Sequence, residues 1–116
     1  MALSPAQVES FIAEGFVRLD AAFSRELAAA ARAILWRDLG ASPDDPSSWR
    51  APVVRLGGYA DPPFVEAARS PRLRAALDRI VGAGAYVPPV GLGTFPVRFP
   101  HADAPNDDGW HIDVSF

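Results

Sequence analysis

Two candidate metal ligands lie two residues apart in the sequence GWHIDVSF, residues 109–116. The alternation of polar and apolar residues predicts a β-strand, in which successive side chains point to opposite faces. His111, Asp113 and Ser115 would then share one face. A neutral imidazole beside a carboxylate can hold two adjacent positions on a divalent metal. One further imidazole would complete the facial triad of non-haem Fe(II) sites.

The same stretch has a simpler interpretation. His111, Asp113 and Ser115 would form the solvated face of a half-buried strand, and the apolar residues between them its buried face. The His-x-Asp pattern is too short to separate a metal site from such a strand.

Composition excludes several other chemistries. The chain has 116 residues, which is one small domain or part of a larger one. All eleven basic residues are Arg, so a lysine Schiff base and a P-loop are excluded, and the lack of Cys excludes disulfides and thiolate chemistry. A net charge of -3 with a pI near 5.2 gives no general field for nucleic acid.

The sequence shows no sign of a membrane or secretion signal. Its N-terminus, MALSPAQVES, lacks a charged region followed by an apolar one. No apolar run approaches the ~20 residues that span a bilayer. We therefore expect a cytoplasmic protein that binds neither membrane nor nucleic acid.

The pattern predicts an α+β fold with helices in the first part of the chain. Residues 1–85 should form a mainly helical support region, in which Ser4, Ser24 and Ser70 cap helices. In the second helix, Asp38 interrupts the apolar stripe and Trp36 lies outside it. Helices are expected at about 5–14, 25–39, 62–68 and 71–81, and short strands at 16–19 and 52–56.

From residue 86 onward the pattern indicates β-structure. Residues 94–99 alternate in polarity and predict a strand, and Pro96 places that strand at an edge or at a break because proline cannot donate to the ladder. A polar loop, residues 101–108, leads to the His-x-Asp strand. Residues 86–116 are thus expected to hold the strands that carry the chemistry.

The segments GTFPVRFP and GWHIDVSF, joined by an acidic loop that contains proline, resemble the phytanoyl-CoA dioxygenase family. This resemblance implies an Fe(II)- and 2-oxoglutarate-dependent oxygenase on a double-stranded β-helix, a jelly-roll or cupin-like fold, preceded by N-terminal helices. It implies that His111 and Asp113 are metal ligands. The family often has a Lys that contacts the cosubstrate near this position, so the resemblance makes Arg98 a candidate contact for 2-oxoglutarate. An edge-strand Arg that faces water is the simpler interpretation.

In the resembling family, the second His ligand and the Arg that binds 2-oxoglutarate lie well downstream of the His-x-Asp motif. Neither is present in these 116 residues, and we interpret His101 as a surface-loop histidine. The expectation is therefore the N-terminal part of a dioxygenase, with an incomplete barrel, that hydroxylates a small organic substrate and is inactive alone. A zinc hydrolase is disfavoured because no HExxH or Cys cluster is present.

A different class of function remains open. The chain would be a non-catalytic α+β domain that packs against a partner through an exposed C-terminal strand. A downstream His followed by an Arg in strand-like sequence would favour the enzyme over this alternative.

Overall fold

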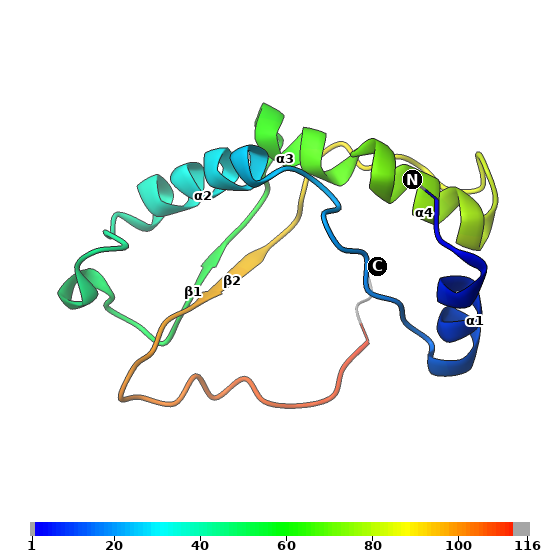
Figure 1. Cartoon of the computed structure of the whole chain (residues 1–116). Coiled ribbons are helices and arrows are strands. Elements are labelled where there is room, and N and C mark those ends of the chain that lie inside the picture. Colours follow the sequence, from blue (N-terminus) through cyan, green and yellow to red (C-terminus); the bar gives the residue numbers. More distant parts are fainter. Residues whose placement is uncertain (1, 113–116) are drawn as a thin grey trace.

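The computed structural model describes residues 2–112 and has an α+β fold (Figure 1). An antiparallel two-stranded sheet lies beneath an arch of helices, and α1 stands at the end of the arch beyond α4. The elements in chain order are α1 (Pro5–Glu14), α2 (Arg25–Leu39), a 3-10 turn (Pro46–Ser48), β1 (Val53–Leu56), α3 (Pro62–Ala68), α4 (Pro71–Val81) and β2 (Phe95–Arg98).

Local capping explains where the helices begin and end. Ser4 and Gln7 form a capping box at the start of α1: the Gln7 amide donates to Ser4 Oγ at 3.2 Å, and the Ser4 amide donates to Gln7 Oε1 at 2.9 Å. Gly15, at φ 81°, ends the helix in the left-handed conformation that glycine adopts without strain. Ser24 and Ser70 cap α2 and α4 as the sequence predicts.

The sheet pairs Val53 with Arg98 and Leu56 with Phe95. The pairing resumes beyond β1 as a single bridge between Tyr59 and Leu92, with N–H···O distances of 2.9 and 2.8 Å. Pro96 lies on a strand that has one neighbour among residues 2–112, which agrees with the predicted edge position.

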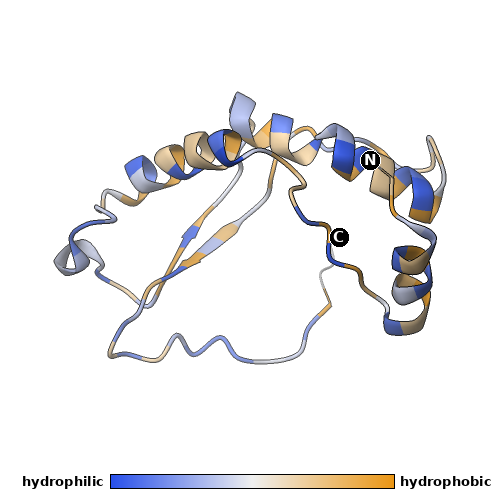
Figure 2. Ribbon diagram, viewed as in Figure 1, coloured by the Kyte–Doolittle hydropathy of each residue, from blue (hydrophilic) through white to orange (hydrophobic). Residues whose placement is uncertain are grey.

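One face of the sheet packs beneath the helices through aromatic rings. Phe64 of α3 is 1% exposed and contacts Tyr59 and Phe95 with tilted rings, whose centroids are 4.7 and 5.5 Å away. At the far end of β2, Phe99 contacts Trp36 of α2 and Trp49, at 5.9 and 5.4 Å. Figure 2 shows the matching apolar positions on the strands and helices.

The packing also accounts for the two exceptions on α2. Trp36 lies off the apolar stripe because it reaches over Phe99. Asp38 interrupts the stripe because its carboxylate accepts a hydrogen bond, at 2.9 Å, from the hydroxyl of the buried Tyr59. Both residues are thus explained by partners that are distant in sequence.

The fold is open for its size. The chain exposes 8557 Å², about 2,400 Å² more than a folded monomer of 12.4 kDa is expected to expose. Its radius of gyration is 16.9 Å, against about 13 Å for a compact domain of this length. Large apolar residues such as Ile12 and Phe16 remain mostly exposed.

Two predicted stretches form no strand within residues 2–112. Residues 16–19 are not in a strand, so the prediction of a strand there is wrong. Residues 109–112 are likewise not in a strand, and the remainder of the predicted His-x-Asp strand lies outside the described residues. A strand requires a neighbour for its ladder, and alternation of polarity alone does not provide one.

Candidate functional site

The sheet face opposite the helices carries a polar pocket of about 490 Å³. Thr94, Pro96 and Arg98 alternate with the half-buried Phe95, Val97 and Phe99, so the pleat places them on this face. Arg55 joins them because it pairs with Pro96 across the ladder. The pocket is lined by Arg55, Thr94, Pro96, Arg98, Asp107 and His111.

Asp107 binds both arginines of this pocket. Its carboxylate accepts two hydrogen bonds from Arg98, at 3.1 and 2.6 Å, and lies 3.5 Å from the Arg55 guanidinium. The hydrogen bonds from Arg98 hold the pKa of Asp107 below its usual 3.8, and Asp107 in turn raises the pKa of Arg98. The carboxylate is therefore ionised at neutral pH.

The structure places Arg98, the predicted cosubstrate contact, on the open polar face. The Arg98 side chain is about half exposed, and its guanidinium is engaged in the bidentate pair with Asp107. An external carboxylate would therefore have to share Arg98 with Asp107 or displace it.

Of the predicted metal pair, the structure describes one residue. His111 lies in an exposed segment at the edge of the polar pocket, and its Nδ1 is 3.5 Å from the Gly109 carbonyl oxygen. Asp113 lies outside the described residues. Trp110 is fully exposed and Ile112 is 83% exposed, so neither side chain walls the pocket.

The metal prediction can be compared with the donors present. Within residues 2–112, no group of three His, Asp or Glu side chains is placed to hold a metal ion. Asp107 is the one carboxylate among the described lining residues, and its pairing with two guanidiniums makes it a poor ligand. His101 is not among the described pocket residues, and its Nδ1 accepts a hydrogen bond from the Asp103 amide within its own loop.

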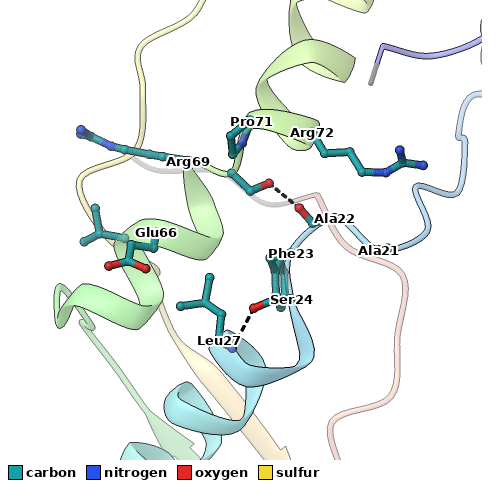
Figure 3. Close-up of a pocket in the computed structure, with 11 residues that line it drawn as sticks. Ala21, Ala22, Phe23, Ser24, Leu27, Glu66, Arg69, Pro71 and Arg72 are labelled. Carbon is teal, nitrogen blue, oxygen red and sulfur yellow. Dashed lines mark hydrogen bonds between the residues drawn. The ribbon is translucent and has the colours of Figure 1, made fainter.

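A larger pocket lies elsewhere, beside the start of α2 and the junction of α3 and α4 (Figure 3). It has a volume of about 680 Å³ and a mostly apolar lining that includes Phe23 and Leu27. Two of its polar side chains hold neighbouring backbone: Ser70 donates to the Ala22 carbonyl, and Arg69 donates to the Pro89 carbonyl. Figure 3 shows the Arg69 and Arg72 side chains extending away from each other on opposite sides of this pocket. These two hydrogen bonds attach the segments around Ala22 and Pro89 to the junction of α3 and α4.

Sequence reasoning missed Asp107 and Arg55. Asp107 is one of several acidic residues in the loop, and nothing in its local pattern distinguishes it. Arg55 could have been found by pairing the two predicted strands, because antiparallel pairing would bring its face to that of Arg98.

Comparison with protein-family models, curated proteins and solved structures finds no match for this chain. The resemblance to the dioxygenase family therefore depends on the quoted residues alone. No helix within residues 2–112 combines the length and the apolar character needed to cross a membrane.

Proposed function

We propose that this chain forms the helix-backed wall of an Fe(II)- and 2-oxoglutarate-dependent dioxygenase of the phytanoyl-CoA dioxygenase type. The observation that supports this function is the two-sided sheet. One face packs on helices through Phe95 and Phe99, while the other carries Arg98 and the loop with His111 beside one polar pocket. In a double-stranded β-helix, the polar face of such a sheet would line the interior of the barrel.

In this proposal the metal would be held by His111 and Asp113, with a third ligand from outside residues 2–112. With 2-oxoglutarate, the bound iron would supply the oxidising chemistry that hydroxylates a small organic substrate. Because the described residues do not form a complete ligand set, we expect the chain alone to bind metal weakly and to be inactive.

Metal binding can be tested with Mn²⁺, a divalent ion that carboxylate ligands suit. The chain has two histidines, so His101→Ala assigns the two sets of imidazole NMR signals. We expect Mn²⁺ to broaden the His111 signals at concentrations that leave His101 sharp, and Asp113→Asn to abolish this selectivity. Equal broadening of both rings would contradict the metal site.

Activity gives a second, separate test. The chain is incubated with Fe²⁺, ascorbate and 2-oxoglutarate, and succinate is measured. No iron-dependent succinate is expected. If it is formed, and is lost in His111→Ala but not in His101→Ala, the chain is a complete enzyme and not one wall of it.

A second candidate function follows from the open surface. The chain exposes about 2,400 Å² more surface than a folded monomer of its mass, which is more than the ~800 Å² that each partner buries in a standard interface. In this alternative, a second copy of the chain packs against the exposed C-terminal segment that carries Trp110 and Ile112.

Sedimentation of the purified chain separates the two functions. The alternative predicts a dimer that Trp110→Ser with Ile112→Ser dissociates, whereas Val87→Ser with Val90→Ser, at positions that are also exposed, does not. A monomer at all concentrations would exclude self-association and leave the oxygenase wall as the remaining proposal.

A further inference from the structure

The segment after β2 returns to the sheet through the carboxylate of Asp107. Residues 99–112 contain no helix or strand, and the last ladder-like bond joins the Phe99 amide to the Pro52 carbonyl at 3.0 Å. Farther along, Asp107 returns to the sheet and meets Arg98 in two parallel hydrogen bonds. A bidentate guanidinium–carboxylate pair fixes orientation as well as distance.

Asp107 differs from its acidic neighbours in burial. Its side chain is 17% exposed, whereas that of Asp103, in the same segment, is 82% exposed and interacts within its own loop. Asp108 is also exposed. Arg55 approaches the same carboxylate from β1, so both strands of the sheet hold Asp107.

We propose that Asp107 is a positioning residue, which holds residues 100–112 against the polar face of the sheet and thereby places His111 beside the pocket. His111 follows Asp107 by four residues and lines the same pocket as Arg98. Without this anchor, the segment would leave the sheet after Phe99, where the ladder-like hydrogen bonds end. This role stands whether or not His111 binds a metal.

The test uses the absence of cysteine. A single cysteine introduced as Trp110→Cys, at a fully exposed position beside His111, carries a nitroxide spin label on the full chain. The label should broaden the amide NMR signals of β2, including Phe95 and Arg98. Adding Asp107→Asn should remove this broadening, because the charge that binds the two guanidiniums is lost. Asp108→Asn, the matched control, should retain it.

A second measurement covers the case in which Asp107→Asn does not fold. Ring contacts between Tyr59 and Phe64 report an intact core in each variant. Salt is then added to the labelled chain with Asp107 unchanged, since the screening length falls from about 10 Å at 0.1 M to about 3 Å at 1 M. The broadening of β2 should decrease with salt. Unchanged broadening in folded Asp107→Asn, equal losses in both Asn variants, or broadening independent of salt would each overturn the proposal.

Discussion

The hydroxyl of Tyr59 donates a hydrogen bond to Asp38 Oδ2 at 2.9 Å, across 21 residues of sequence. The same carboxylate accepts a bond from its neighbour Arg37, also at 2.9 Å. This pair connects the end of α2 to the segment that follows β1, close to the aromatic cluster around Phe64. It therefore joins the helical layer to the sheet beside the buried Phe64.

Removing the carboxylate should be worse for stability than removing the hydroxyl. Asp38→Ala leaves the buried Tyr59 hydroxyl without its acceptor, whereas Tyr59→Phe leaves Asp38 paired with Arg37. We expect Asp38→Ala to lower the urea midpoint more than Tyr59→Phe, and the double variant to fall short of the sum. Tyr86→Phe is the control, because the Tyr86 hydroxyl has no hydrogen bond within residues 2–112. Additive losses would show that the pair is not coupled.

The ionisation of Tyr59 makes the fold sensitive to alkali. Burial, followed by the hydrogen bond to Asp38, raises the pKa of Tyr59 above 10.0. The unfolded chain therefore releases the Tyr59 proton at a lower pH than the folded chain does. The stability that the protonated hydroxyl contributes is complete below about pH 10 and is lost as the pH rises through the folded-state pKa. In this pH range the urea midpoint of the wild type should fall more than that of Tyr59→Phe. Parallel curves would contradict the raised pKa.

Phe64 should be the most sensitive apolar position. Its side chain is 1% exposed and contacts both Tyr59 and Phe95, so Phe64→Ala should cost about 3–5 kcal/mol of unfolding free energy. Phe16→Ala is the matched control at 68% exposure and should change stability by about 0.5 kcal/mol or less. Similar losses for both would mean that residues 16–19 pack more closely than this structure shows.

The helices could be predicted because their signals are local. Ser4 with Gln7, Ser24 and Ser70 each cap a helix within three residues of themselves, and Gly15 ends α1 through its own backbone. Both partners of such a contact lie within a few residues of each other, so a short stretch of sequence is enough to recognise it. The α+β class followed from these helices together with the two short strands.

The site could be predicted only in part because its contacts span long separations. The link from Asp107 to Arg98 and Arg55 depends on where a loop returns, and no periodicity specifies that. Residues 16–19 and 109–112 have strand-like sequence but form no strand in the part of the chain that the structure describes. The metal pair His111–Asp113 and the cosubstrate role of Arg98 therefore stay predictions.

Two glycines that are two residues apart should respond differently to alanine. A Cβ at Gly91 would overlap the Tyr59 carbonyl oxygen, which accepts the bridge bond from Leu92, whereas a Cβ at Gly93 meets no atom within 4 Å. Gly91→Ala should therefore destabilise by about 1–3 kcal/mol. Gly93→Ala should be neutral or stabilise by up to about 1 kcal/mol. Thermal unfolding of both variants measures this, and a tolerated Gly91→Ala would mean that the Tyr59–Leu92 bridge is not close-packed.

Acid should release the segment that Asp107 anchors, but only at low pH. Hydrogen bonding to Arg98 lowers the folded-state pKa of Asp107. The stability that the ion pair contributes is therefore complete above the unfolded-state pKa of about 3.9, and it is lost as the pH falls through the lower folded-state pKa. The charges facing this carboxylate are Arg98 and Arg55, while Asp108 also acts on Arg98. The Asp107 carboxyl carbon shift, followed by NMR, should titrate below 3.8 in the wild type. In Arg98→Gln it should titrate closer to that value, and identical titrations in the two proteins would show that Arg98 does not hold the charge of Asp107.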